Sequence, residues 1–344
     1  MRRILFTIIT IAMALQGAIA CTSAIVSAKA TKNGRPLLWK NRDTGTLDNF
    51  VARVTPRSPG DHEYVALYNA GDSTLSEAWI GMNNQGFAIM NTASYNLAPD
   101  TAKLRDREGI VMSQALRQCR TTADFASLLD TLPRPMGVQA NFGVIDALGG
   151  GGYFEVDDLS YRFYSLDEAE SGVLVRTNYS FSGAEGQGMG YIRYDNACHL
   201  LQPHIEAADI TPLTFTDELS CSFYHSLLGY DLLTDTTRTW IVDQDFIPRR
   251  STSASVVIEG INPGEDLQNG IMWTALGYPP VATVEKVTLS EIPSELLPDS
   301  NWHSPECDAA MKRKRQVFPN TSGSGPHYIY LPALTHFLKQ RKSH

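Results

Sequence analysis

The sequence lacks the features of several common protein classes. No apolar run reaches the about 20 residues that a membrane-spanning helix needs, and only 19% of the residues are charged. Positive charge is in the minority, with 29 Lys and Arg residues against 37 Asp and Glu residues. The formal net charge of −8 argues against nucleic acid or anionic lipid as a main partner. Because 43% of the residues are hydrophobic, we expect a soluble globular chain with no membrane span.

Signals for a metal or a phosphate-binding cofactor are also missing. The glycine run at 149–152 lacks the Gly-Lys-Ser/Thr ending of a phosphate-binding loop, and it lies between two strand-like runs. We therefore interpret it as a hairpin turn and expect no cofactor and no metal. None of the five cysteines forms a CxxC pair or a Cys/His cluster with zinc spacing; they are Cys21, Cys119, Cys198, Cys221 and Cys307.

The first twenty residues have the composition of a secretory signal peptide. A basic start, Met1-Arg2-Arg3, precedes a short apolar segment at 4–15, and the segment ends in Ala18-Ile19-Ala20. Twelve apolar residues are too few for a membrane anchor. We expect cleavage after Ala20 and export to the periplasm or out of the cell. The mature chain would then begin with Cys21.

The residue pattern predicts antiparallel sheets with a few helices. Asn33-Gly34 is a hairpin signal between strands expected at 22–30 and 36–43. Helices are expected within 108–131, where Thr121 or Thr122 caps the second of two, and at 191–207. Other strand-like runs lie at 65–68, 78–82, 87–91, 141–147, 153–156, 253–258 and 282–289. Hairpins without regular βαβ alternation favour an α+β fold.

A cysteine in first position combines a thiol with a free α-amine. The pKa of an α-amine is about 7.7–8.0, so the amine can act as a general base near neutral pH. The nucleophile then carries its own base, and a nearby cation favours the thiolate. Two alternatives remain open: Cys21 is lipidated, as in a bacterial lipoprotein, or it is a disulfide partner. Ala18 argues against lipidation, because the lipidation motif usually has leucine at that position.

The segment after this cysteine resembles a known family. Cys21-Thr22-Ser23, followed by the run Gly34 to Asp43 (GRPLLWKNRD), is similar to the N-terminal nucleophile hydrolases. The closest group is the linear-amide hydrolases, which include choloylglycine hydrolase, penicillin V acylase and the 6-aminopenicillanic acid acyltransferases. Further similar stretches lie at 80–91, 141–155 and 173–193. The resemblance implies a four-layer αββα sandwich of antiparallel sheets, a small-molecule amide substrate and no cofactor.

The resemblance also implies roles for residues near Cys21. Asp43 would hold the α-amine, and Lys40 takes the place usually given to arginine beside the thiol. Lysine keeps the positive charge but lacks the planar fork of arginine. In a regular strand Lys40 and Asp43 point to opposite faces, so we expect a bulge or strand end near Asp43.

Three more site residues follow from the resemblance. The hairpin at 81–88 (GMNNQGFA) is similar to a family hairpin whose following strand carries an oxyanion asparagine, and Asn91 is the candidate. Its register is open by a residue or two, and a turn-capping asparagine is the alternative. Asn178 would contact the nucleophile and substrate, with a simple turn asparagine as the alternative. Arg193 would complete the site, with an exposed helical arginine as the alternative.

The resemblance and the chain pattern together predict three segments. Residues 1–20 form the signal peptide, 21–310 the catalytic domain, and 311–344 a basic extension that packs on the domain or on a partner subunit. The extension contains the run 312–315 (KRKR), interpreted as a solvated charge run, and the run 322–325 (SGSG).

The predicted function is that of an exported hydrolase that cleaves a non-peptide linear amide through a thioester on Cys21. N-acyl amino acids, bile-salt-like amides and penicillin-V-like amides all suit this family. An acyltransferase of the same family and a non-catalytic surface lipoprotein lipidated at Cys21 are the alternatives, and a homo-oligomer is left open. The other four cysteines permit up to two disulfides, and we expect at least one, although buried thiols are equally compatible with the sequence. The many aromatic residues favour an apolar acyl pocket.

Overall fold

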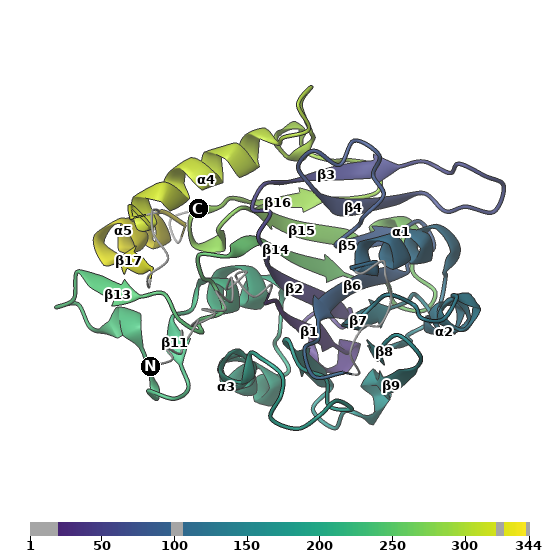
Figure 1. Ribbon diagram of the computed structural model, residues 1–344, viewed down its shortest axis with the longest axis horizontal. Helices are drawn as coiled ribbons and strands as arrows, with labels where there is room; N and C mark the ends of the chain where they lie inside the picture. The colour runs from purple at the N-terminus through teal and green to yellow at the C-terminus, as the bar shows by residue number, and fades with distance from the viewer. Residues whose placement is uncertain (1–19, 98–105, 321–326, 342–344) are drawn as a thin grey trace, which may run out of the picture.

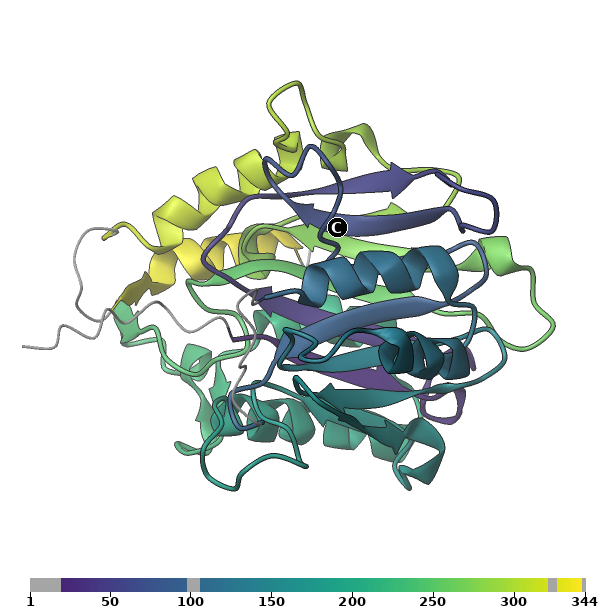
Figure 2. The same ribbon diagram turned by 45° about the vertical axis from the view of Figure 1, so that its right-hand side comes forward.

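The computed structural model describes residues 20–97, 106–320 and 327–341. The expected signal peptide and the run at 322–325 therefore lie outside the described residues, except for Ala20. Two antiparallel sheets stack face to face, with helices on both outer sides (Figures 1 and 2). No helix within the described ranges is long and apolar enough to span a membrane.

The six-stranded sheet carries the N-terminal segment at its centre. Strands β1 and β2 form the predicted first hairpin, and β14 pairs with the other side of β2. In spatial order the strands are β10 (Val173–Arg176), β1 (Thr22–Val26), β2 (Leu37–Asp43), β14 (Thr252–Glu259), β15 (Ile271–Leu276) and β16 (Val284–Val287). The first strand is shorter than expected, because a 3-10 turn occupies Ala28–Ala30.

The seven-stranded sheet is a meander in which sequential strands are neighbours. Its strands are β3 (Asn49–Val54), β4 (Tyr64–Asn69), β5 (Ile80–Asn83), β6 (Ala88–Ala93), β7 (Ala140–Ile145), β8 (Gly151–Val156) and β9 (Tyr161–Ser165). The glycine run covers the end of the turn between β7 and β8 and the first two residues of β8, as the hairpin interpretation predicts. Two short ribbons complete the strands: β11 (Tyr224–His225) with β12 (Tyr230–Asp231), and β13 (Trp240–Val242) with β17 (Tyr328–Tyr330).

In the described part of the chain, five α-helices surround the sheets. They are α1 (Glu108–Gln118), α2 (Thr122–Thr131), α3 (Tyr191–Ala207), α4 (Pro305–Val317) and α5 (Leu331–Arg341). The cap of α2 is Thr121, whose side chain accepts a hydrogen bond from the backbone N–H of Asp124 while the Asp124 side chain bonds back to the cap.

Three apolar cores separate four layers. One core lies between the seven-stranded sheet and helices α1 and α2, and a second lies between the two sheets. The third lies between the six-stranded sheet and α3. In β1, Ile25 faces the other sheet while Ala24 and Val26 face α3, because successive strand residues point to opposite faces. The predicted αββα sandwich is therefore the fold observed.

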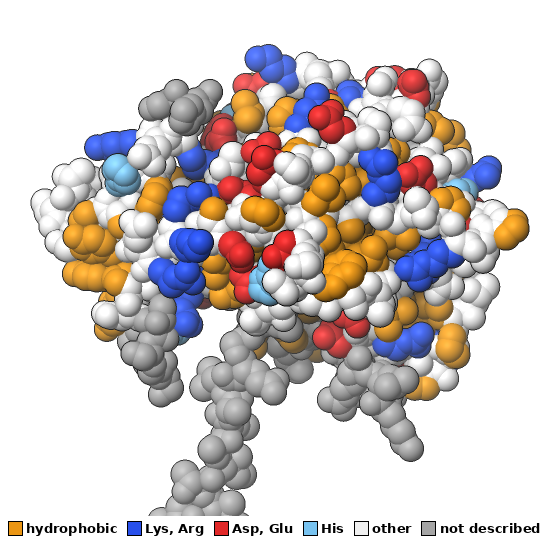
Figure 3. Space-filling view, turned by 90° about the horizontal axis from the view of Figure 1, so that it is seen from above, with side chains coloured by type: hydrophobic (Ala, Val, Ile, Leu, Met, Phe, Trp, Pro, Cys, Tyr) orange, Lys and Arg blue, Asp and Glu red, His pale blue; other side chains and the backbone are white. Residues whose placement is uncertain are grey.

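The C-terminal segment continues the packed structure. The predicted boundary after residue 310 falls inside α4, and Val317, Leu331 and Leu334 join a core that also contains Phe223 and Phe246. The solvated interpretation of the run at 312–315 is wrong for Lys314, which is 4% exposed. On the face seen in Figure 3, Lys and Arg side chains are interspersed with Asp and Glu.

All five cysteines lie among the described residues, and none of them forms a disulfide bond. The expectation of at least one disulfide is therefore wrong. The thiols are distributed over different layers: Cys119 lies beneath α1, and Cys307 lies between the sheets. Such a distribution keeps the side chains from pairing.

Candidate active site

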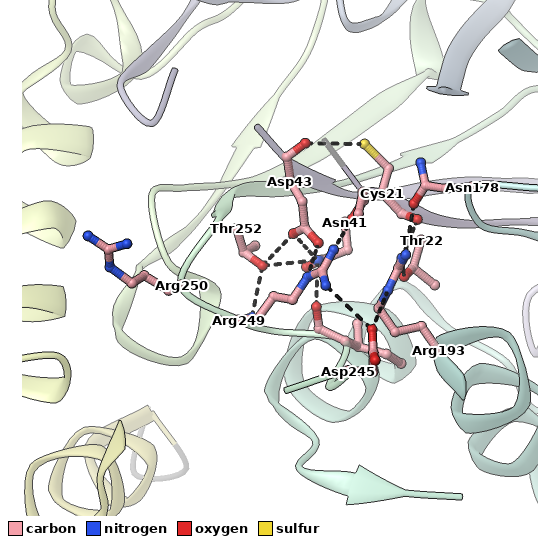
Figure 4. A network of polar contacts seen from close by, with 12 residues as sticks. Cys21, Thr22, Asn41, Asp43, Asn178, Arg193, Asp245, Arg249, Arg250 and Thr252 are labelled. Carbon is pink, nitrogen blue, oxygen red and sulfur yellow. Dashed lines mark hydrogen bonds and ion pairs between the residues drawn. The ribbon is translucent and has the colours of Figure 1, made fainter. Parts of the chain in front are cut away.

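Cys21 lies directly before β1, at the end of the central strands. Its side chain is 4% exposed, and its Sγ lies 3.7 Å from the main-chain oxygen of Asp43, which accepts the thiol hydrogen bond (Figure 4). Because Ser23 bonds to Tyr153 of the other sheet and Ile25 packs between the sheets, strand alternation directs Cys21 toward the same inter-sheet side.

Lys40 lies on this inter-sheet side and is 1% exposed. Its Nζ donates to the Oδ1 of Asn91 at 2.7 Å and to the main-chain oxygen of Trp79 at 2.9 Å. The bond to Oδ1 fixes the orientation of the Asn91 amide and leaves its nitrogen as the donor. Burial lowers the pKa of Lys40 to about 8, against the opposing effect of Cys21.

The carboxylate of Asp43 lies on the opposite face of β2, toward α3. It accepts hydrogen bonds from Thr252 Oγ1 at 2.6 Å and Asn41 Nδ2 at 3.3 Å, and it pairs with Arg249 Nε at 2.7 Å. The expected irregularity is present, because the register between β2 and β14 shifts between Thr252 and Ala254. Asp43 is also the last residue of β2.

Arg249 connects this carboxylate to the peptide bond that precedes Cys21. Its Nη2 donates to the main-chain oxygen of Ala20 at 3.1 Å. Burial lowers the pKa of Arg249, but Asp43 and Asp245 outweigh that effect and the net shift is upward. The carboxylate of Asp43 thus lies next to the bond whose cleavage would free the α-amine.

Arg193 and Asn178 hold the main chain at the start of β1. Arg193 is 1% exposed and donates to the oxygen of Cys21, to Thr22 Oγ1 at 2.9 Å and to Asn178 Oδ1 at 2.8 Å. Asn178 in turn donates to the main-chain oxygen of Ala93 at 2.8 Å. Burial, followed by the charge of Arg249, lowers the pKa of Arg193 to about 10. The exposed-arginine alternative is therefore wrong.

The sequence interpretation missed several members of this network. Arg249 and Thr252 bind Asp43. The Oδ1 of Asp245 lies 3.5 Å from Arg249 Nη1 and 3.9 Å from Arg193 Nε. The sequence feature that could have pointed to Arg249 is the Arg249-Arg250 pair just before the strand expected at 253–258. Glu108, at the start of α1, was also missed; it is buried next to the Cys21 cavity.

A cavity of about 220 Å³ opens beside the thiol. Most of its lining residues have polar or charged side chains, but apolar atoms form the larger part of the wall surface, so the wall is mixed and does not contradict the apolar pocket that the aromatic content favoured. Trp79 lies on this wall, whereas other aromatic residues are used in the core, as in the cluster of Phe125, Phe142 and Phe154. The cavity is lined by Cys21, Lys40, Arg42, Asp43, Thr44, Gly45, Thr46, Asn69, Glu77, Trp79, Asn91, Ala93, Asp106 and Glu108.

The two stacked sheets with helices on both outer sides make an α+β protein with a four-layer αββα sandwich, and the buried cysteine lies directly before a central strand. No family model and no curated protein matches the sequence. Solved structures to which the chain is similar include an N-acylethanolamine-hydrolyzing acid amidase ortholog from Caenorhabditis elegans, with 13% identity and a TM-score of 0.48. That match covers 70% of this chain and 92% of the other.

Two bacterial enzymes give similar alignments. A conjugated bile acid hydrolase variant from Clostridium perfringens has 13% identity and a TM-score of 0.47, covering 78% of this chain and 93% of the other. Penicillin V acylase from Agrobacterium tumefaciens has 11% identity and a TM-score of 0.42, covering 79% and 87%.

Proposed function

We propose that the protein is an exported amidase that cleaves linear amides with Cys21 as nucleophile, after removal of residues 1–20. The observation that carries the proposal is the placement of the Cys21 thiol in one cavity with Lys40 and Asn91. A thiol, a buried cation and an oriented amide donor are the groups that thioester chemistry needs.

In the proposed reaction the α-amine of the mature Cys21 takes the thiol proton, and the thiolate attacks the amide carbonyl. Asn91 donates to the developing oxyanion, and Lys40 holds the Asn91 amide by its oxygen. The carbon–nitrogen bond then breaks, and the protonated α-amine gives its proton to the leaving amine. Water attacks the thioester, with the α-amine again as base, and releases the acid and the thiol.

The residues on the helix side of Cys21 would position the new N-terminus. Arg193 binds the Cys21 carbonyl oxygen, and Asp43 with Arg249 lies beside the bond to Ala20. Both polar atoms of the Asn178 amide are engaged by other protein groups, so we assign it to holding Arg193 rather than to the oxyanion.

The burial of Cys21 also supports this proposal over the lipoprotein alternative. A diacylglyceryl group is attached to the cysteine sulfur and must reach a lipid surface, whereas this side chain is 4% exposed and faces the space between two sheets. Acyl transfer to another amine remains the alternative within the same chemistry, because an amine can replace water at the thioester.

Two measurements test the proposal. The mass of the exported protein should correspond to a chain that begins with free Cys21, without lipid. A screen of linear amides should show hydrolysis by the wild type and none by Cys21→Ala. A lipidated N-terminus, or equal turnover by the two proteins, would contradict the proposal. Added amine acceptors distinguish transfer from hydrolysis by the product formed.

A further inference from the structure

Besides Asp43, whose carboxylate pairs with Arg249, three acidic residues line the cavity that contains the Cys21 thiol. Glu77, Asp106 and Glu108 lie on its wall together with Lys40 and Arg42. The inference drawn from them rests on the proposed function and concerns the substrate class. No group of three or more His, Cys, Asp or Glu side chains in the described part of the chain is arranged to hold a metal ion.

Glu108 has an unused hydrogen-bonding atom. It is the first residue of α1 and 6% exposed, and its Oε1 accepts the backbone N–H of Gln139 at 2.9 Å. Its Oε2 has no hydrogen-bond partner among the described residues. A buried polar atom without a hydrogen-bond partner destabilises the folded protein. A donor group on a bound ligand would remove that destabilisation.

The cations of the cavity are already engaged by other groups. Lys40 bonds to Asn91 and to Trp79, whereas Arg42 donates to Asn49 and Asn69, both at 2.7 Å, and stacks on the Trp79 ring. Neither cation forms an ion pair with the three carboxylates, all of which belong to the described residues.

The carboxylates instead repel one another. Burial raises the pKa of Glu108 to about 8, and the charge of Asp106 and a side-chain hydrogen bond to Asp106 add to the rise, so Glu108 holds a proton at neutral pH when the cavity is empty. Burial and the charge of Asp106 also raise the pKa of Glu77. A bound cation would favour the charged form of these crowded carboxyl groups, so the cavity wall is complementary to a cation that donates hydrogen bonds.

We infer that the amide substrates of this enzyme carry an ammonium group close to the scissile bond, which binds to Glu108 with Asp106 and Glu77 beside it. An ammonium supplies three donors and a point charge, so a small cavity can accommodate it. The group can belong to the acyl half or to the amine half of the substrate, and the two cases are separable by experiment.

The test uses four amides in two matched pairs. The acyl pair is 6-aminohexanoyl-p-nitroanilide and hexanoyl-p-nitroanilide, and the amine pair is N-hexanoyl-1,5-diaminopentane and N-hexanoyl-pentylamine. In at least one pair, kcat/KM should be about tenfold or more higher for the cationic amide. In Glu108→Gln the ratio of kcat/KM for the cationic amide to kcat/KM for the neutral amide should fall to about 1. The exposed control Glu170→Gln should keep the ratio of the wild type.

A second variant protects the test against a folding defect in Glu108→Gln. Asp106→Asn should reduce the same preference, and asparagine suits the left-handed backbone at this position, where φ is 62°. Calorimetry with Cys21→Ala measures binding of the cationic amides without turnover.

The outcomes separate the two claims. Wild-type hydrolysis without a cationic preference, or a preference unchanged in both variants, overturns the inference and leaves the proposed function standing. Binding of a cationic amide by Cys21→Ala, with no hydrolysis of any amide by the wild type, overturns the proposed function alone. Neither binding nor hydrolysis overturns both.

Discussion

Lys40→Met removes the only charge that holds Asn91 in the described site. The methionine fills a similar volume, but Asn91 Oδ1 and the main-chain oxygen of Trp79 lose donors that lie 2.7 and 2.9 Å away. If Lys40 orients the oxyanion donor, kcat should fall by about 10² or more, the scale on which the loss of one such donor acts. KM should change less, because the interaction is used in the transition state.

The pH dependence of stability gives an independent measure of the same residue. Lys40 has a pKa of about 8 in the folded protein against 10.5 as its ordinary value, so the unfolded chain binds more protons between these pH values. Stability then rises with pH across this window, since the slope has the sign of protons bound in the unfolded minus the folded state. The free energy of unfolding rises by about 3 kcal/mol across this window, when the shift in the pKa of Lys40 is converted at 1.36 kcal/mol per pKa unit.

The assay compares the free energies of unfolding of wild type and Lys40→Met by urea denaturation from pH 7 to 11. The difference between the two should move in favour of the wild type by about 3 kcal/mol as the pH rises through 8 to 10.5. The exposed control Lys32→Met should show no such trend. A difference independent of pH, together with full activity of Lys40→Met, would refute both the burial argument and the role in orienting Asn91.

Three further predictions concern other parts of the chain. A glycine retained ahead of Cys21 converts the α-amine into an amide, so activity should fall by about 10² or more with folding nearly unchanged; full activity of the unprocessed, folded protein would exclude the terminal-nucleophile mechanism. Lys314→Met should lower the free energy of unfolding by about 1–3 kcal/mol in urea titrations, because the buried Nζ donates to Thr252 O at 3.1 Å, and the exposed Lys312→Met should not. Thiol titration of denatured, unreduced protein should count five thiols, and three or one would contradict the free cysteines.

Local patterns predicted much of the fold. The hairpin signals at Asn33-Gly34, at the Gly81 to Ala88 segment and at the glycine run correspond to β1–β2, β5–β6 and β7–β8. These turns are short-range features, in which residue types fix the backbone conformation and therefore the pairing. The capping box of α2 is equally local.

The strands that were missed lack such local signals. The outer strand β9 has the sequence Tyr-Arg-Phe-Tyr-Ser, and none of these residues is fully buried. A 3-10 turn follows directly, and no turn signal in the sequence marks the end of the strand. Strand β15 is recognisable only by its pairing with β14, which is a tertiary contact. The placement of the cysteines in separate cores is also a property of the whole fold, so counting them left the disulfide question open.

The candidate site likewise contains residues that local sequence patterns indicated and residues that they did not. Lys40 and Asp43, which are close to Cys21 in the sequence, were proposed from the motif. Asn91 was proposed from the strand after a hairpin, and Asn178 from the end of a further strand. Arg249 was not found, because no local pattern says which arginine will pair with a buried carboxylate more than two hundred residues away.

Two sets of polar contacts lie next to Cys21, one between the sheets and one on the side of α3, and strand geometry explains why. Lys40 and Arg42 point between the sheets, whereas Asn41 and Asp43 point toward α3, because successive residues of β2 alternate. The inter-sheet side therefore presents a cation and an amide donor to the thiol. The helix side presents Asp43, Arg249 and Arg193 to the main chain of Cys21. An N-terminal cysteine is the residue that can use both sides at once, since its thiol and its α-amine leave the same Cα in different directions. Substitutions on the inter-sheet side should then alter acyl transfer, and those on the helix side should alter the placement of the base.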